Sequence, residues 1–181
     1  DREQLVQFSA SQDVRIYLQP GNPESVVALQ PEHPVDELHY RLPAFDLTLT
    51  FGPTDFIQVH SEVNRQMVDQ ALRLLAPTAA DRVLDLYCGI GNFTLPLARH
   101  AGEVLGLEGA AAAIHRGRHN ATLSGLSNAR FVEADLAGAG TEGAWTRERF
   151  DLVLLDPPRT GAVELLPALG KLAARRIVYV S

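Results

Sequence analysis

Residues 82–92 read Arg-Val-Leu-Asp-Leu-Tyr-Cys-Gly-Ile-Gly-Asn, an apolar run that leads into two closely spaced glycines. The first half of this stretch predicts a strand buried on both faces, because parallel strands covered by helices show near-continuous hydrophobic runs. Gly89 and Gly91 then predict a turn whose backbone can approach a ligand closely. With a helix expected over residues 93–99, the unit indicates a nucleotide-type binding site at the carboxyl end of a strand.

Two residues around the turn narrow the kind of nucleotide. A dinucleotide-binding fingerprint has a third glycine where this chain has Thr94. Asp85 lies just before the turn, where a negative charge favours a cationic ligand over a pyrophosphate. The pattern Asp-x-x-x-Gly-x-Gly resembles motif I of methyltransferases that use S-adenosylmethionine (SAM). For the glycines alone, an ordinary tight connection between strand and helix is the alternative interpretation.

Two further predicted strands also end in acids. Residues 103–108 end in Glu108, which falls 19 residues after Gly89, where Rossmann-like folds place a carboxylate that binds ribose hydroxyls. Residues 129–135 end in Asp135, and the corresponding acid of methyltransferases lies beside the adenine. A single acid of this kind is more often a solvated strand end, whereas acids at successive strand ends favour a ligand site.

A second motif closes the next predicted strand. Residues 150–159 read Phe-Asp-Leu-Val-Leu-Leu-Asp-Pro-Pro-Arg, and the two prolines fix the backbone and remove amide donors. We therefore expect Asp156 to point into the crevice, and residues 176–181 to form a fifth strand. The predicted fold class is α/β: a Rossmann-like, SAM-dependent methyltransferase sheet, truncated after its fifth strand and preceded by a small β-rich segment.

Two longer helices are predicted between these strands. Ser61 is the expected N-cap of the first, and Val63, Met67, Ala71 and Leu75 recur at steps of four on its expected core face. The second covers residues 110–125, where His115 and His119 share one face. No third ligand is spaced to join these histidines, so we reject a metal site and expect a solvated face.

At 181 residues the chain is long enough for one full domain or for one and a fraction, and its hydrophobic content of 46% is ample for a buried core. Residues 1–50 carry the strand and turn signals of a small β-rich piece, which is either part of a central or substrate-binding domain or only a packing extension. Its strands are expected over residues 14–18, 25–29 and 38–51. Residues 51–181 are assigned to the SAM-binding methyltransferase domain, incomplete at its C-terminal end, with a loop over residues 138–149.

The charge is −6 overall, and residues 1–60 carry three arginines against nine acids. So acidic a chain should not bind nucleic acid through bulk electrostatics. A single cysteine excludes an internal disulfide framework and a cysteine-built metal site. No apolar run is long enough to cross a membrane and the start is not a signal peptide, so we expect a soluble cytoplasmic protein without membrane contact.

Taken together, these motifs resemble the bacterial RNA (uracil-5-)-methyltransferases, most nearly those that methylate a uracil of 23S ribosomal RNA. The resemblance covers the catalytic portion without obvious gaps, and residues 1–50 also resemble the central region of such enzymes. The segments that carry it are Phe-Ile-Gln-Val at 56–59, the stretch from Asp85 to Ala98, Gly-Leu-Glu-Gly at 106–109, Leu-Leu-Asp-Pro-Pro-Arg at 154–159 and Ile-Val-Tyr-Val-Ser at 177–181.

The resemblance implies a set of site residues. The SAM-binding set is Gln58, Tyr87, Gly89, Gly91, Asn92, Glu108, Asp135 and Asp156. Within it, Glu108 is expected at the ribose, Asp135 at the adenine, Asn92 with the glycine turn at the methionine end, and Tyr87 as an aromatic wall. Asp156 and Arg159 are expected to border the flipped-out uracil, because an enzyme acting on a base ring takes the base from the stack.

The chemistry of this family uses a cysteine thiolate that adds to C6 of uracil and a base that later removes the C5 proton. That cysteine is expected directly after Ser181, and Cys88 is rejected as a substitute because it belongs to the glycine turn. The family's glutamate base, its N-terminal RNA-binding part and the iron-sulfur cluster of some members are also expected outside this chain. We therefore predict that the chain binds SAM at best, transfers no methyl group, and exposes residues 176–181 as an edge liable to self-association.

Three alternatives stay open at this point. The RNA substrate can be a transfer RNA methylated at uracil C5 rather than 23S ribosomal RNA. A methyltransferase of exocyclic amines would have Tyr or Phe in place of Arg159, which argues against that class. A non-catalytic SAM-binding module would lack a cysteine after Ser181.

Overall fold

The computed structural model describes residues 1–22, 25–31, 38–136 and 143–181. The chain divides into two compact units, unit 1 with residues 1–38 and 51–55 and unit 2 with residues 39–50 and 56–181. Residues 39–50, which the sequence grouped with the N-terminal segment, thus belong with unit 2. The assignment of residues 1–50 to a substrate-binding domain stays a prediction.

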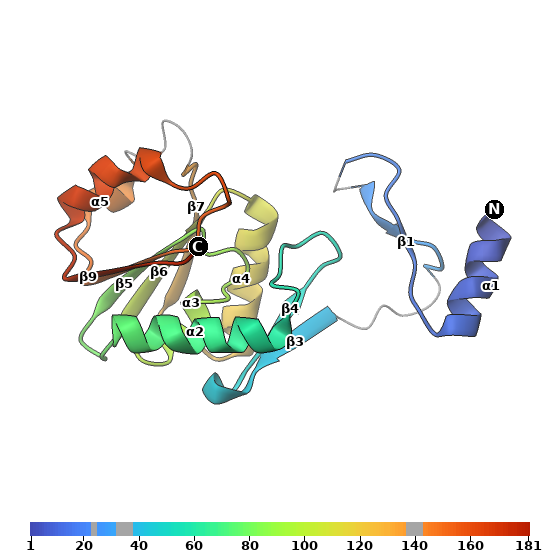
Figure 1. Ribbon diagram of the computed structural model, residues 1–181, viewed down its shortest axis with the longest axis horizontal. Helices are drawn as coiled ribbons and strands as arrows, with labels where there is room; N and C mark the ends of the chain where they lie inside the picture. The colour runs from blue at the N-terminus through green and yellow to red at the C-terminus, as the bar shows by residue number, and fades with distance from the viewer. Residues whose placement is uncertain (23–24, 32–37, 137–142) are drawn as a thin grey trace. The chain divides into compact units, whose positions relative to one another are not determined.

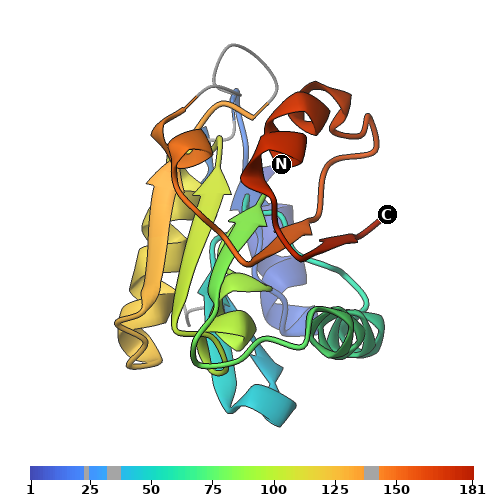
Figure 2. The same ribbon diagram turned by 90° about the vertical axis from the view of Figure 1, so that its left-hand side faces the viewer.

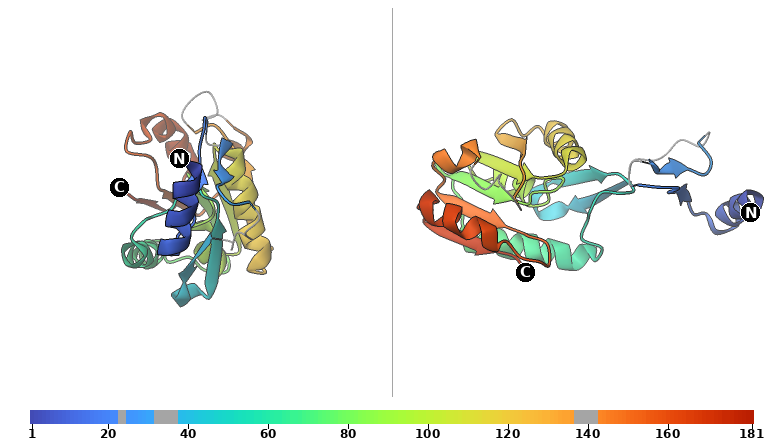
Figure 3. Two further views of the ribbon diagram at one scale, coloured as in Figure 1. Left: turned by 90° about the vertical axis from the view of Figure 1, so that its right-hand side faces the viewer. Right: turned by 90° about the horizontal axis from the view of Figure 1, so that it is seen from above.

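Unit 1 contains a helix, α1 (Arg2–Gln12), and a small hairpin of β1 (Tyr17–Leu18) and β2 (Val27–Ala28), drawn in blue in Figure 3. These two strands lie within the ranges predicted at residues 14–18 and 25–29 and pair antiparallel, although both are shorter than expected. The helix was not predicted, because it has no continuous apolar face and buries only Ser9. Its start is nevertheless marked in the sequence, since the side chain of Asp1 accepts a hydrogen bond from the amide of Glu3.

Unit 2 is built on a five-stranded sheet in the order β7-β6-β5-β8-β9, and neighbouring strands in it run parallel. The chain therefore runs outward from the central strand to β7, returns to the other side of that strand and continues to β9 (Figures 1 and 2). This order confirms the predicted α/β class and places the reversal of strand order between β5 and β8. The strands are β5 (Arg82–Leu86), β6 (Glu103–Glu108), β7 (Ala129–Glu133), β8 (Leu152–Leu155) and β9 (Arg176–Tyr179).

Helices cover both faces of this sheet, and each face has its own hydrophobic core (Figure 1). Alternate residues of β5 serve the two cores, since Val83 belongs to one and Leu84 to the other. Trp145, in the short helix η4 (Ala144–Arg147), is buried in the second core. The first core packs against α2 (Ser61–Leu75), α3 (Thr94–Ala98) and α4 (Ala111–Leu123), and the second against η5 (Val163–Leu165) and α5 (Leu166–Leu172).

The buried face of α2 agrees with the predicted one except at its start. Ala71 and Leu75 are buried and Met67 packs partly buried against the core, whereas Val63 is 55% exposed. Steps of four residues turn a helix by about 400°, so residues at this spacing drift by about 40° at each step and Val63 falls outside the core side. The start also differs by one position, because His60 is the N-cap and its ring nitrogen accepts from the amide of Val63. The residues on the buried face are Asn64, Val68, Ala71, Leu72 and Leu75.

A two-stranded ribbon accompanies the main sheet. It consists of β3 (Leu38–Leu42) and β4 (Leu47–Phe51), joined through the short helix η2 (Pro43–Phe45). Strand structure over residues 38–51 was predicted, and Leu47 and Leu49 are buried in the first core as their alternation indicates. Of the predicted loop at 138–149, residues 138–142 lie outside the described part of the chain.

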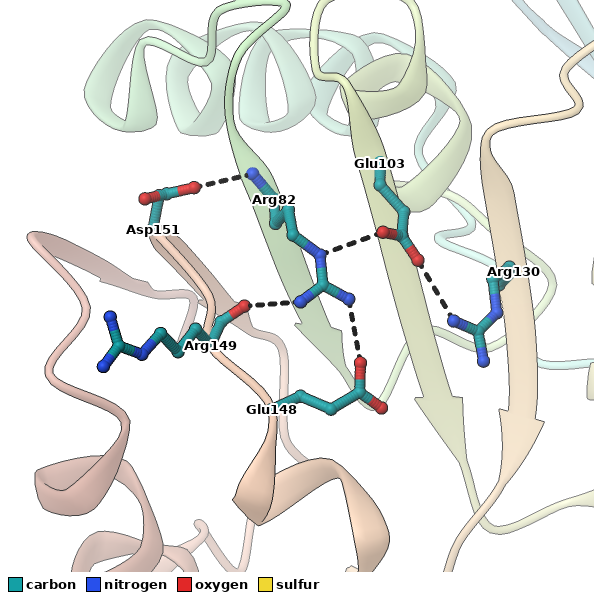
Figure 4. A network of polar contacts seen from close by, with 6 residues as sticks. All are labelled: Arg82, Glu103, Arg130, Glu148, Arg149 and Asp151. Carbon is teal, nitrogen blue, oxygen red and sulfur yellow. Dashed lines mark hydrogen bonds and ion pairs between the residues drawn. The ribbon is translucent and has the colours of Figure 1, made fainter.

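A polar network connects the amino ends of the strands (Figure 4). The guanidinium of Arg82 donates to Glu103 at 2.9 Å, to Glu148 at 2.8 Å and to the carbonyl of Arg149 at 2.9 Å. Its backbone amide donates to Asp151 at 2.8 Å. A second arginine, Arg130, extends the network to β7 by donating to Glu103 at 3.1 Å. These contacts hold the strands at the end of the sheet opposite to the glycine turn.

Candidate functional site

The glycine turn that follows β5 has left-handed backbone angles. Tyr87, Gly89 and Gly91 have φ of 65°, 52° and 99°. At position 91 space is also limiting, because an added Cβ would lie 3.1 Å from side-chain atoms of Leu95 and Phe131. Glycine is therefore required there by conformation and by packing, which explains this part of the motif.

Glu108 is the last residue of β6, and its side chain bonds to the backbone of the glycine turn. One carboxylate oxygen accepts from the amide of Gly89 at 3.2 Å, and the other accepts from the amide of Ala110 at 3.0 Å. Each oxygen has a second lone pair, so the carboxylate can accept hydroxyl groups of a ligand without giving up these bonds. The residue is partly exposed, which leaves it accessible at the carboxyl end of the strand.

Asp85 is completely buried, so the expectation that it presents its charge to a ligand is wrong. The hydroxyl of Thr94 donates to one carboxyl oxygen at 2.6 Å, and the other oxygen has no partner among the described residues. The pKa of Asp85 is raised to about 7, mainly by burial; the hydrogen bond from Thr94 lowers it, and the charges of Asp156 and Glu108 add to the rise. The sequence predicts that this strand is buried on both faces, but it does not show that the carboxyl group of Asp85 is turned inside and bonded to Thr94.

Cys88 is buried in the same turn. Burial raises the pKa of its thiol well above the ordinary value, and nearby negative charge of Asp85 and Glu108 acts in the same direction. Gly106 makes room for it, because a Cβ there would lie 2.9 Å from the sulfur. A buried neutral thiol is inert, in agreement with its rejection as a nucleophile.

A pocket lies beside the turn and gathers four of the predicted site residues: Gln58, Gly89, Asn92 and Asp156. Asp156 is partly buried, and burial raises the pKa of its carboxyl group. Exposed Phe56 reaches the same pocket from the segment that precedes α2. The full lining is Tyr40, Phe56, Ile57, Gln58, Cys88, Gly89, Ile90, Asn92, Phe93 and Asp156.

The other predicted site residues lie outside this lining. Tyr87 is partly buried and its hydroxyl donates to the carbonyl of Leu136 at 3.4 Å, and burial raises its pKa. Asp135 is exposed just beyond β7, and Arg159 is exposed in the Pro-Pro-Arg segment after β8. Gly91 is part of the turn itself, and Glu108 accepts a hydrogen bond from the amide of Gly89 in that turn. Which of these groups contacts a ligand stays a prediction.

Sequence reasoning missed three polar residues that hold the turn. Tyr40 and Asn64 both donate to the side-chain oxygen of Asn92 at 2.9 Å. Asn120 of α4 is fully buried and donates to the carbonyl of Ile90 at 3.2 Å. A signal did exist for Asn64 and Asn120, because each is an asparagine on the buried face of a helix, where a polar group requires a partner.

The described residues contain neither a metal-binding cluster nor a membrane-spanning helix. No group of three or more His, Cys, Asp or Glu side chains there is placed to hold a metal ion. Within the same ranges, no helix has the length and apolar character needed to cross a membrane. His115 and His119 of α4 are both exposed.

The parallel sheet, the glycine turn and the acids at its strand ends define a Rossmann-like fold of SAM-dependent methyltransferases. A solved structure of this fold is the Salinibacter ruber RNA methyltransferase in complex with S-adenosyl-L-homocysteine, with a TM-score of 0.50, 23% identity and coverage of 62% of this chain and 69% of that chain. The chain belongs to the tRNA (Uracil-5-)-methyltransferase family, whose sequence model matches residues 36–181.

Curated relatives match the entire chain. The 23S rRNA (uracil(1939)-C(5))-methyltransferase RlmD of Alkalilimnicola ehrlichii is 51% identical over all 181 residues, and that of Pseudomonas aeruginosa is 48% identical. The chain spans about 40% of the length of these relatives. Among solved structures, the Pyrococcus abyssi tRNA (uracil-54, C5)-methyltransferase in complex with S-adenosyl-L-homocysteine has a TM-score of 0.65 and 27% identity, covering 79% of this chain and 34% of that chain.

Proposed function

We propose that this chain is the SAM-binding part of a cytoplasmic enzyme that methylates C5 of a uracil in 23S ribosomal RNA. The observation that carries the proposal is the 51% identity to a 23S rRNA uracil methyltransferase over the whole chain. A tRNA substrate has weaker support, since the Pyrococcus abyssi tRNA methyltransferase is 27% identical.

The residues present fit SAM as the cofactor. Glu108 is anchored by two backbone amides and keeps lone pairs for the ribose hydroxyls. Asp135, beyond β7, suits the exocyclic amine of adenine, and Tyr87 suits the face of the ring. Asn92, Gln58 and the turn backbone suit the amino-acid end. The cofactor supplies an activated methyl group when it is bound.

Asp156 and Arg159 are proposed to face the target base. Asp156 lies in the pocket with Gln58, next to a backbone fixed by two prolines. A carboxyl group whose pKa is raised by burial can accept from or donate to the edge of a uracil ring. The exposed guanidinium of Arg159 is suited to a phosphate of the RNA backbone.

The chain by itself is proposed to bind and orient without transferring the methyl group. The reaction requires a thiolate that adds to C6 of uracil, and the chain's one cysteine is the buried, neutral Cys88. The overall charge of −6 also provides little general attraction for RNA. We therefore assign the nucleophile, the base and most of the RNA affinity to other parts of the enzyme. In some family members those other parts also carry an iron-sulfur cluster.

Calorimetric titration with S-adenosylhomocysteine tests the proposal. We expect the chain to bind, and Glu108→Ala to weaken binding at least about ten-fold, because a ribose contact made through a charged acceptor is lost. Glu62→Ala, on the exposed side of α2, is the control and should bind like the unchanged chain. Absence of binding, or equal affinity of both variants, would count against a cofactor site here.

Methyl transfer is tested separately. Incubation of the chain with labelled SAM and 23S ribosomal RNA should give no 5-methyluridine. The same incubation with tRNA should also give none. Label in either RNA would contradict the proposed division of roles and would identify the substrate class.

The exposed edge of β9 carries a further part of the proposal. Ile177 and Tyr179 are 46% and 50% exposed on this edge strand, a combination that favours pairing with a second copy. We expect the sedimentation coefficient of the isolated chain to rise with concentration, and Ile177→Lys to suppress that rise. A concentration-independent monomer would argue against self-association.

A further inference from the structure

The side chain of Asn92 lies at the centre of a cluster contributed by three elements. The hydroxyl of Tyr40 in β3 donates to its oxygen at 2.9 Å, and the amide nitrogen of Asn64 in α2 donates to the same oxygen at 2.9 Å. The amide nitrogen of Asn92 donates back to the oxygen of Asn64, also at 2.9 Å. Asn64 is buried, and Tyr40 and Asn92 both line the pocket.

This cluster fixes which hydrogen-bonding groups Asn92 can offer. Its oxygen has two lone pairs and accepts two donors, so its accepting capacity is used. Its nitrogen has two hydrogens, and one of them is used by Asn64 among the described contacts. What Asn92 can present to a ligand in the pocket is therefore an N–H donor. Without the hydroxyl of Tyr40, an oxygen lone pair would be available and the amide could rotate to offer either group.

Asn120 restrains the same turn from another side. It donates to the carbonyl of Ile90 at 3.2 Å and to the carbonyl of Thr50 at 3.1 Å, and it accepts from the amide and hydroxyl of Thr50 at 2.9 Å. Two buried asparagines thus hold neighbouring positions of the turn, one from α2 and one from α4. Rigid support of this kind is what a precise contact to a ligand requires.

We propose that Tyr40 and Asn64 are positioning residues that orient Asn92 as a hydrogen-bond donor to the carboxylate at the amino-acid end of the cofactor. The inference rests on the proposed SAM site and deepens it. A carboxylate is an acceptor, and a donor held in place before binding loses little entropy when the ligand arrives. An amide free to rotate would offer its oxygen part of the time and would repel the same group.

Two ligands separate this role from a general structural one. S-adenosylhomocysteine has the amino-acid part, and 5′-methylthioadenosine has the adenosine and sulfur without it. We expect Tyr40→Phe to raise the Kd of S-adenosylhomocysteine about five-fold, the size expected for one hydrogen bond, and to leave the Kd of methylthioadenosine unchanged. Tyr17→Phe in unit 1, which removes a buried hydroxyl without a described partner, is the matched control and should change neither.

Two further variants test whether Tyr40 acts through Asn92. In an Asn92→Ala background, Tyr40→Phe should have no additional effect on the Kd of S-adenosylhomocysteine. Asn92→Asp keeps acceptors for Tyr40 and Asn64 but replaces the donor by a negative oxygen. It should therefore weaken the binding of S-adenosylhomocysteine more than Asn92→Ala does. The two variants should bind methylthioadenosine with equal affinity.

The outcomes distinguish the inference from the proposed function. The positioning role is overturned, while the cofactor site stands, by any of three results. Tyr40→Phe could raise the Kd of both ligands by the same factor, change neither Kd, or add its full effect to that of Asn92→Ala. If the unchanged chain binds neither ligand, the proposed cofactor function of this chain is overturned and the inference with it.

Discussion

The hydroxyl of Thr94, in the first turn of α3, donates to the carboxyl group of Asp85 in β5 at 2.6 Å, inside a completely buried site. The second carboxyl oxygen has no partner among the described residues. Ionisation of this group is therefore costly, in agreement with its pKa of about 7.

The pH dependence of stability follows from this pKa. Between its ordinary value of 3.8 and about 7, the folded chain keeps a proton on Asp85 that the unfolded chain releases. The free energy of unfolding therefore falls as pH rises through this window. The Asp85→Asn variant has no such titration. Between pH 4.5 and pH 7.5, the free energy of unfolding measured in urea should therefore drop by at least about 1 kcal/mol more in the unchanged chain than in the variant. Equal losses in both proteins would show that Asp85 is ionised throughout.

Arg175 and Asp81 form a two-point ion pair, with nitrogen to oxygen distances of 2.6 and 2.8 Å. The bonds from Arg175 hold the pKa of the buried Asp81 carboxyl well below its ordinary value. Arg175→Ala should lower the free energy of unfolding at pH 7 by more than the loss of an exposed ion pair would, because a buried carboxylate loses charged hydrogen bonds. This difference should narrow as the pH falls below about 4, where the unfolded acid becomes protonated.

A surface ion pair serves as the control for that measurement. Arg73 and Asp69 lie 2.8 Å apart on the exposed side of α2. Arg73→Ala should cost less than about 0.5 kcal/mol, because exposed pairs of this spacing contribute little. A similar loss in both variants would mean that the burial of Asp81 does not matter.

Gly91→Ala should damage the turn. The residue has φ of 99°, and a Cβ would lie 3.1 Å from Leu95 and Phe131. We expect a loss of about 2 kcal/mol in the free energy of unfolding and weaker binding of S-adenosylhomocysteine. Gly170→Ala in α5 is the matched control, since no atom lies within 4 Å of its Cβ position, and it should stabilise the chain by up to about 1 kcal/mol. A Gly91→Ala chain as stable as the original would contradict the strain.

Asn120→Ala should be strongly destabilising. It leaves the buried amide of Thr50 and the carbonyl of Ile90 without their partner, at a cost of about 3 kcal/mol in thermal or urea unfolding. Thr122→Ala, on the exposed side of the same helix, removes a hydroxyl bonded to the carbonyl of Arg118 and should change stability by less than about 0.5 kcal/mol. Comparable effects of the two substitutions would show that burial of the amide is unimportant.

The sequence predicted the sheet well, because buried parallel strands have continuous apolar runs and end abruptly. Residues 103–108 were predicted to form a strand with the bounds found in β6. Helices were harder to predict. A helix with little apolar periodicity, such as α1, shows few signals, and α5 carries Pro167 in its first turn and Gly170 near its end.

The strand-end acids and the glycine turn of the candidate site were visible as local patterns. The residues that hold the turn were not, because their contacts join positions 28 to 70 residues apart in the sequence. The burial of Asp85 was missed for a related reason. Its surroundings are set by Thr94 and the neighbouring strand β6, and a single strand motif does not show which side chains close over it.

The network around Arg82 has a practical consequence for engineering. It joins β5 to β6 through Glu103, and to the segment before β8 through Glu148, at the end of the sheet away from the pocket. The polar network that stabilises the sheet and the pocket that is proposed to bind the ligand thus lie at opposite ends of the same strands. Substitutions that strengthen the amino ends can raise tolerance to heat or denaturant while the pocket keeps its chemistry, so one end offers reserve stability for changing specificity at the other.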